Sequence, residues 1–161
     1  MFGVIHWQQE QKGGDCQAFG HSRGGFTTKI HVRTDGQERP LSFILTGGEI
    51  SDYKVVPDLI AMNDSNPCLM LADKGYDADH VRESLLLKGI LPVIPPRSNR
   101  KYPQTYDRKA YKDRNRIERM FNQIKQSRWI ASRYDKTKTV FMAFLNIAAI
   151  KLWVKYCVNK A

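Results

Sequence analysis

Cysteine is scarce in this sequence, and its spacing does not suggest metal binding. The 161 residues contain only Cys16, Cys68 and Cys157, an odd number of widely separated thiols. Structural zinc sites use closely spaced cysteine pairs, and disulfide frameworks use an even number of cysteines. The four histidines also lack the spacing of metal ligands. The sequence therefore favours a protein of the reducing cytoplasm, without a zinc site or a disulfide framework.

Long uninterrupted apolar runs are also lacking. The strongest candidate covers residues 140–158, but Asn146, Lys151 and Lys155 interrupt it. A membrane-spanning helix needs about 18 clean apolar residues. Residues 1–7 are too short for the apolar region of a signal peptide and run directly into polar sequence. We therefore expect no membrane association, and we interpret residues 140–158 as a buried helix of a soluble protein.

Acidic residues are the third scarce class. Asp and Glu number 16 against 26 Lys and Arg, so the formal net charge at pH 7 is +10. Such a charge attracts polyanions and repels basic partners. Nucleic acid is therefore the first partner to consider. The alternative is a solvated basic surface that only keeps the protein soluble.

The composition is sufficient for one compact domain, because 42% of the 161 residues are hydrophobic. Residues 8–25 are polar, glycine-rich and without a period, which predicts a loop or arm. Ordered structure is expected to begin at Phe26. We therefore divide the chain into an amino-terminal arm, residues 1–25, and a core, residues 26–161.

A β-hairpin is predicted at the start of the core. Two sets of residues alternate from Phe26 to Arg33, one of them mainly hydrophobic, which is the period of a half-buried strand. Asp35 and Gly36 are turn residues, and residues 40–46 have the composition of a second strand.

Helices and strands alternate after the hairpin. Asp52 is placed to cap a short helix. Residues 68–72 form an unbroken apolar run, which predicts a strand buried on both faces, as in a parallel sheet flanked by helices. A helix over residues 77–88 is expected to end at Gly89, and residues 91–94 predict another short strand.

The carboxyl-terminal part is basic and helical. Basic residues concentrate in residues 97–116, and a long helix is predicted over residues 113–130. Its buried stripe consists of Ile117, Met120, Phe121 and Ile124. A last helix follows. This order of elements predicts an α/β fold with a mixed sheet.

Asp73 ends the most apolar predicted strand. Open α/β sheets bind their ligands at the carboxyl ends of strands, so the position is that of a functional residue. A lone aspartate at such a place more often opens a turn, here with Lys74 and Gly75, or caps the next helix. Position alone leaves both interpretations open.

Glu118 lies at the edge of the buried stripe of the long helix, about 100° from Ile117. Arg114 and Lys125 share this flank. An acid among basic residues is usually a surface ion pair. A carboxylate that holds a divalent cation beside DNA would have the same neighbours, because the basic residues would contact phosphates. The pattern alone does not distinguish a surface ion pair from a metal ligand beside DNA.

Four sequence blocks resemble the DDE-type transposases of the insertion-sequence-five family. The blocks are GHSRGGFTTKIH (20–31), LADKGYDAD (71–79), LPVIPPRSNRK (91–101) and YKDRNRIERMFNQIKQSRWIASRYDK (111–136). They occur in the family's order and spacing, and the resemblance extends from residue 20 to about residue 153. A lone DKGYD would be weak support, but four ordered blocks are specific.

The resemblance implies a ribonuclease-H-like fold with a mixed sheet flanked by helices. In this family two Asp and one Glu hold two Mg²⁺ (or Mn²⁺) ions for DNA strand cleavage and joining. Asp73 matches the second acid and Glu118 the third, so both are predicted as catalytic residues and metal ligands. Carboxylates are hard oxygen ligands that suit Mg²⁺.

Basic residues of the matched blocks and of the basic segment form the predicted DNA-binding set. Arg114 and Lys125 accompany the Glu in the family's pattern, and we expect them to contact phosphates rather than to catalyse. The full set is Arg23, Lys29, Arg97, Arg100, Lys101, Arg114, Lys125, Arg128 and Arg133.

The chain departs from the family at its start. The family's first Asp belongs to an opening strand ahead of the SRGG block, and neither Glu10 nor Asp15, both in polar loop sequence, is a convincing substitute. Residues 1–7 are expected to retain the end of that strand. We therefore expect the opening strand to be missing or incomplete and residues 1–25 to be a remnant of it and its loop. A truncated copy and the downstream reading frame of a frameshifted element both fit.

The leading hypothesis is a bacterial DDE transposase of the nucleoid-associated cytoplasm. Its expected partners are double-stranded DNA, as terminal inverted repeats and target, and further copies of itself. The isolated chain is expected to be inactive or nearly so. A catalytically inactive DNA-binding remnant is the main alternative, and a metal-dependent nuclease that only hydrolyses DNA is a third hypothesis.

Overall fold

An antiparallel hairpin forms the centre of the fold. Strand β3 (Gly25–Thr34) pairs with β4 (Pro40–Gly47), which confirms the predicted hairpin. The Asp35 carboxylate closes the turn, because it accepts hydrogen bonds from the backbone N–H groups of Gln37 and Arg39 at 2.8 and 3.0 Å. The computed structural model describes residues 2–8, 20–22, 25–62, 66–131 and 137–159.

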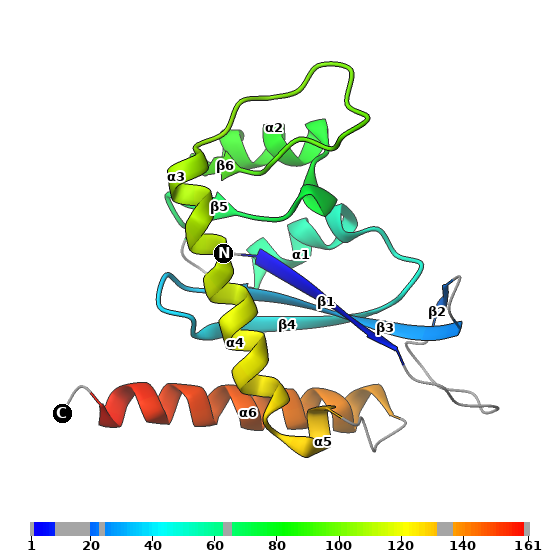
Figure 1. Cartoon of the computed structure of the whole chain (residues 1–161), viewed down its shortest axis with the longest axis vertical. Coiled ribbons are helices and arrows are strands. Elements are labelled where there is room, and N and C mark those ends of the chain that lie inside the picture. Colours follow the sequence, from blue (N-terminus) through cyan, green and yellow to red (C-terminus); the bar gives the residue numbers. More distant parts are fainter. Residues whose placement is uncertain (1, 9–19, 23–24, 63–65, 132–136, 160–161) are drawn as a thin grey trace.

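Two further strands extend this sheet. Strand β1 (Phe2–Gln8) pairs antiparallel with β3, and the short β2 (Gly20–Ser22) pairs with the start of β3 (Figure 1). The prediction of an unstructured segment up to residue 25 is therefore wrong at β2 and at Gly25. Polar and glycine residues give no hydrophobic period, yet their backbone groups can pair with an existing strand. The loop prediction is also wrong at Gln8, which belongs to β1, and the rest of the predicted loop, residues 9–19 and 23–24, lies outside the described residues.

The segment after β4 covers the hairpin on one side. The 3₁₀ helix η1 (Asp52–Val55) leads into α1 (Val56–Ala61). The prediction that Asp52 caps this helix is wrong, because η1 begins after Ser51 and has no side-chain cap. The Asp52 carboxylate binds Lys29 instead.

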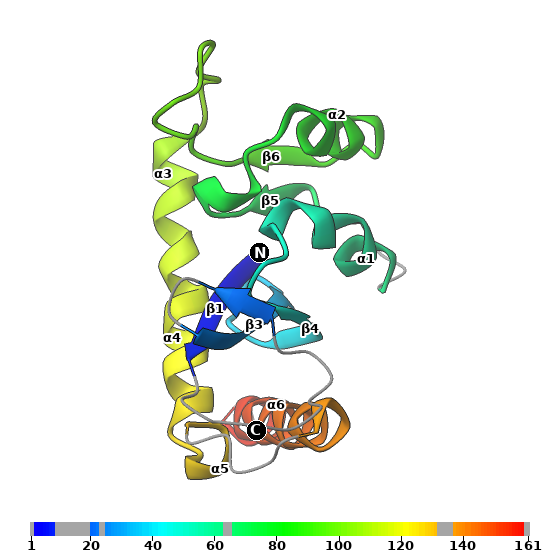
Figure 2. The same cartoon turned by 90° about the vertical axis from the view of Figure 1, so that its right-hand side faces the viewer.

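A small parallel sheet follows. Strand β5 (Leu69–Leu71) pairs with β6 (Leu91–Val93), and α2 (Asp79–Leu87) connects them (Figure 2). Met70 is buried but Leu69 is exposed, so the prediction of a strand buried on both faces holds only in part. Between β5 and α2 lies the 3₁₀ helix η2 (Lys74–Tyr76).

The predicted long helix is broken into segments. Helix α3 (Arg108–Tyr111) and the 3₁₀ helix η3 (Lys112–Arg114) precede α4 (Asn115–Lys125), and α5 (Arg128–Ala131) follows after a turn. The predicted stripe on α4 is confirmed. Its members, all buried, are Ile117, Met120, Phe121 and Ile124.

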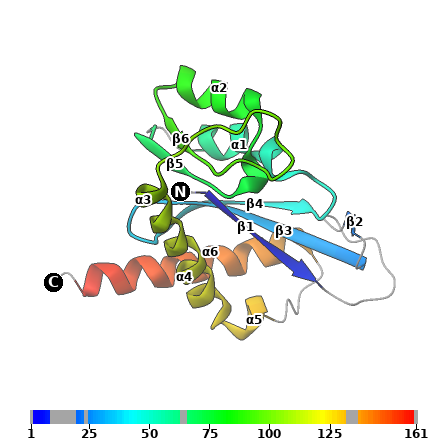
Figure 3. The ribbon, with the colours of Figure 1, turned by 45° about the horizontal axis from the view of Figure 1, so that its top comes forward.

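Helix α6 (Lys138–Val158) runs beneath the sheet (Figures 1 and 3). Phe141 and Leu145 are fully buried, and the indole N–H of Trp153 donates to the Pro40 carbonyl at 2.9 Å. The prediction of a buried helix is only partly correct, because Ile147 and Ile150 on another face are exposed. By length and composition α6 could span a membrane, but this single helix, packed along one face, does not indicate a membrane protein.

Two hydrophobic cores lie on either side of the hairpin. One core joins β3 and β4 to α4, α5 and α6, and includes Ile30, Phe43 and Phe121. The other joins η1, α1, β5, η2, α2 and the residues on either side of β6, and includes Leu59 and Tyr76. The fold is thus mixed α/β, as predicted. This layering brings the end of β5 to the same side of the molecule as α3 and the start of α4 (Figures 1 and 2).

Gly89, as predicted, ends α2, and its backbone allows a direct test. Its φ of +71° lies in the left-handed region, and no atom lies within 4 Å of where a Cβ would be. Gly89→Ala should lower the free energy of unfolding by about 1 kcal/mol through backbone strain alone, and Gly89→Asn by less. Urea denaturation measures both. Gly36 also has open space but no positive φ, so Gly36→Ala is the control, and equal losses at both positions would contradict this account.

Candidate functional site

Asp73 lies directly after β5, where the chain leaves the small sheet. Ala72 before it is fully buried, whereas Asp73 is exposed. One carboxylate oxygen, Oδ1, accepts a hydrogen bond from the Lys74 backbone N–H at 2.7 Å and caps η2. The capping role considered from the sequence is therefore present. It does not exclude a ligand role, because the carboxylate remains accessible to solvent.

Glu118 lies in the first turn of α4 with its side chain 59% exposed. The Arg114 guanidinium donates to its Oε1 at 2.5 Å, which is an i,i+4 pair on one helical flank. Exposed pairs of this kind contribute about 0–1 kcal/mol to stability. The pair therefore orients Glu118 more than it stabilises the fold.

Arg114 connects the two predicted acids. Burial lowers its pKa, but Tyr111, Glu118 and Asp73 raise it, and the net pKa lies above the ordinary value. The carboxylates of Asp73 and Glu118 thus act on the same guanidinium. The two acids come from separate elements, yet the fold brings them into one electrostatic neighbourhood.

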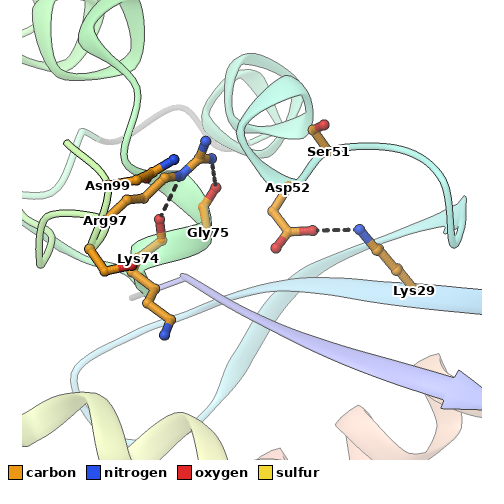
Figure 4. Close-up of a pocket in the computed structure, with 8 residues that line it drawn as sticks. Lys29, Ser51, Asp52, Lys74, Gly75, Arg97 and Asn99 are labelled. Carbon is orange, nitrogen blue, oxygen red and sulfur yellow. Dashed lines mark hydrogen bonds and ion pairs between the residues drawn. The ribbon is translucent and has the colours of Figure 1, made fainter.

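The turn of η2 borders a polar pocket of about 540 Å³. Arg97 donates to the carbonyl oxygens of Lys74 and Gly75 at 3.2 and 2.8 Å (Figure 4). Its guanidinium therefore holds the backbone of the turn, a role not predicted from the sequence. The lining residues are Lys29, Ser51, Asp52, Lys74, Gly75, Arg97, Ser98 and Asn99.

Lys29 lines this pocket, and its ammonium group is paired within the protein. Its ammonium group donates to Asp52 Oδ1 at 2.9 Å and to the Ile50 carbonyl at 2.6 Å. The side chain is only 8% exposed. The predicted DNA contact of Lys29 stays a prediction, and a phosphate would reach this buried, paired ammonium only if these contacts broke.

Asp77 is a buried acid that the sequence did not single out. Its side chain is fully buried and accepts from Arg82 at 2.9 Å, Arg100 at 2.7 Å and the Arg97 backbone N–H at 2.9 Å. Burial raises the pKa of Asp77, but these hydrogen bonds together lower it by more, so its net pKa lies below the ordinary value. Asp77 also lies outside α2, which starts at Asp79, two residues later than the helix predicted over residues 77–88. The sequence signal for this ion pair was an aspartate followed five positions later by an arginine.

Arg100 is likewise paired within the protein, and its predicted DNA contact stays a prediction. It forms ion pairs with Asp77 and Asp79, and its Nε donates to the Tyr102 carbonyl at 3.0 Å. The remaining predicted DNA contacts are more accessible. Lys101, Lys125 and Arg128 are exposed. Arg23 and Arg133 lie outside the described residues.

The donor set for a metal ion is limited to carboxylates. Asp73 and Glu118 offer exposed oxygens, which suit Mg²⁺ or Mn²⁺. Within the part of the chain that the structure describes, no group of three or more His, Cys, Asp or Glu residues is arranged to hold a metal ion. Two carboxylates fit a divalent ion in chemistry, but they form an incomplete ligand set.

Comparisons with known proteins agree with the sequence blocks. Residues 5–153 match the family model described as Transposase DDE domain. A transposase of insertion sequence element IS6501 from Brucella ovis is 35% identical over 133 residues, covering 80% of this chain and 99% of that relative. A transposase of IS402 from Burkholderia cepacia is 28% identical over 133 residues, covering 74% of this chain and 59% of that relative.

The Asp77 cluster yields a stability test. Asp77→Asn should lower the free energy of unfolding by about 3 kcal/mol, because it leaves the buried Arg82 without its carboxylate. Asp79→Asn is the control, since the Asp79 side chain is exposed and its loss should change stability by less than about 0.5 kcal/mol. Chemical denaturation of both variants measures the difference.

The pH dependence of the same variants provides a second measurement. Because folding lowers the pKa of Asp77, its stabilisation is present above the unfolded pKa of about 3.9 and is lost as the pH falls through the folded value. The wild type should therefore lose more stability on acidification below about pH 4 than Asp77→Asn. Parallel pH curves would contradict the role of the Asp77 carboxylate.

Proposed function

Because this chain belongs to the transposase DDE domain family, we propose that it performs metal-dependent DNA strand cleavage and transfer at insertion-sequence ends, with Asp73 and Glu118 as catalytic acids. The observation that carries this proposal is the match of residues 5–153 to the transposase DDE domain, together with the exposed carboxylates that Asp73 and Glu118 present from two different elements. The narrower assignment to the insertion-sequence-five family stays a prediction.

A divalent ion would be held by the exposed oxygens of Asp73 and Glu118. Mg²⁺ or Mn²⁺ supplies charge that activates the attacking oxygen and stabilises the leaving oxygen of phosphoryl transfer. Arg114 already balances both carboxylates, since it pairs with Glu118 and responds to Asp73. Its part is therefore to orient Glu118 and to limit repulsion between the two acids. The capping bond from Lys74 orients Asp73.

A ribonuclease-H-like fold is the finer fold assignment that we propose. It is supported by the antiparallel strands β1, β3 and β4, followed by the parallel strands β5 and β6 joined through α2. The family's first acid has no counterpart in our proposal among the described residues, and β1 is the strand nearest in sequence to the place where the family carries it. The amino end of β1 lies beside β5 in Figures 1 and 2.

A DNA-binding protein without cleavage activity is the second candidate function. The observation that favours it is the lack of a third metal-binding side chain near Asp73 and Glu118 among the described residues. Such a protein would still bind insertion-sequence ends, and it could join the oligomer of an active transposase. In both proposals the chain acts on double-stranded DNA in the bacterial cytoplasm.

DNA contact should depend on the exposed basic residues. Lys101→Ala and Arg128→Ala should each reduce the slope of log affinity against log salt by about 1, because each removes one phosphate contact. Fluorescence anisotropy with a duplex at several salt concentrations measures the slope. Lys88→Ala is the control, since exposed Lys88 is the carboxyl-terminal cap of α2, a helix that lies away from α3 and α4 (Figure 2). An unchanged slope in both test variants would contradict this surface.

Cleavage of a labelled terminal-repeat duplex separates the two functions. We expect the 161-residue chain to cut little or not at all with Mg²⁺ or Mn²⁺, and a chain extended by the family's opening strand to cut. In the extended chain, Asp73→Asn or Glu118→Gln should reduce cleavage about 100-fold or more with DNA affinity largely unchanged. Glu83→Gln, an exposed glutamate on α2, is the matched control. Metal-dependent cutting that survives Asp73→Asn would refute the catalytic assignment.

A further inference from the structure

We propose that Asp52, held by Lys29, is a positioning residue for the turn that carries Asp73. The inference rests on the proposed function, because it treats Asp73 as a metal ligand. Asp52 lies 21 positions before Asp73 in sequence and belongs to a different element, η1. In this proposal Asp73 contacts the metal ion, whereas Asp52 contacts neither metal nor DNA.

The Lys29–Asp52 pair is buried enough to be strong. The side chains are 8% and 19% exposed, and the ammonium also donates to the Ile50 carbonyl. Ion pairs attract more strongly away from water, and loss of one partner leaves the other with an uncompensated charge. Lys29 belongs to the central strand β3, so the pair ties the start of η1 to the most extensively paired strand of the fold.

The second Asp52 oxygen lies against the turn itself. A Cβ added to Gly75 would lie 2.5 Å from Asp52 Oδ2, much closer than any ordinary contact. A side chain at position 75 would therefore clash with the Asp52 carboxylate unless that carboxylate moved. Oδ1 binds Lys29 while Oδ2 faces the turn, so a single carboxylate connects β3 to η2 (Figure 4).

Tyr76 provides an independent sign that Asp52 and Asp73 flank the same turn. Its ring is fully buried, and its hydroxyl has no hydrogen-bond partner among the described residues. Burial raises its pKa most, and Asp52 and then Asp73 raise it further. Both carboxylates therefore act on one phenol.

Arg97 and Asp52 hold different parts of the turn. Arg97 binds its carbonyl oxygens, whereas Asp52 packs against the α-carbon of Gly75. The turn also has its own hydrogen bonds, from Tyr76 N–H to the Asp73 carbonyl at 2.9 Å and from Asp77 N–H to the Lys74 carbonyl at 3.1 Å. These two amide protons report directly on whether the turn stays closed.

Amide hydrogen exchange of the 161-residue chain tests the proposal without any activity assay. In Asp52→Asn, exchange at the Tyr76 and Asp77 amides should accelerate roughly 10- to 100-fold, because the charged contact is lost. Asp35→Asn is the matched control: Asp35 pairs with Arg39, and its side chain is 20% exposed, close to that of Asp52. Unchanged exchange in Asp52→Asn, or equal acceleration in both variants, would overturn the positioning role.

A double variant tests the contact between Asp52 and Gly75 even if Asp52→Asn is destabilised. Gly75→Ala should also accelerate exchange, since its methyl group meets Asp52 Oδ2, and Asp52→Ala should remove most of that additional effect. Additive effects would overturn the contact. Mn²⁺-induced broadening of the Asp73 amide signal then tests the metal: no broadening in the wild type contradicts the proposed function, whereas the exchange results still decide the positioning role by themselves.

Discussion

The buried Asp77 carboxylate is the interaction on which the arrangement around Asp73 depends. It joins three separate parts of the chain, because it accepts from Arg82 on α2, from Arg100 and from the backbone of Arg97. Arg82 in turn donates to the Ile94 carbonyl after β6 at 2.7 Å. A single unpaired acid at this depth would be costly, but three donors make the cluster stable. The segment after β6 is thereby fixed against η2.

This cluster changes how the basic charge of the chain is understood. A net charge of +10 suggests a surface open to DNA, yet several of the predicted contacts are used inside the protein. Arg97 and Arg100 hold the turn and the segment after β6, and Lys29 holds Asp52. The charge available to phosphates lies on residues such as Lys101 and Arg128, which are exposed. Some positive residues therefore stabilise the fold around Asp73, while others remain exposed on the surface.

The sequence was sufficient where a period or an abrupt change marks an element. Alternation predicted the β3–β4 hairpin, the stripe including Phe121 predicted the buried face of α4, and the end of an apolar run placed Asp73 after β5. Side-chain pairs between different elements have no periodic pattern in the sequence. Lys29 and Asp52 are 23 positions apart, and a buried lysine in an alternating strand looks like a solvent-facing one. The polar β2 and the break after α4 also depend on tertiary contacts rather than on local pattern.

The central proposal is that Asp73 and Glu118 bind one divalent ion, and that Arg114, which pairs with Glu118, releases it when the ion binds. The most direct measurement is a crystal structure of the chain soaked in Mn²⁺, with anomalous scattering used to locate the ion. We predict a single peak in contact with both carboxylates, and with Arg114 no longer paired to Glu118. A structure in which the two carboxylates point to different faces, or in which Mn²⁺ binds elsewhere, would contradict the account.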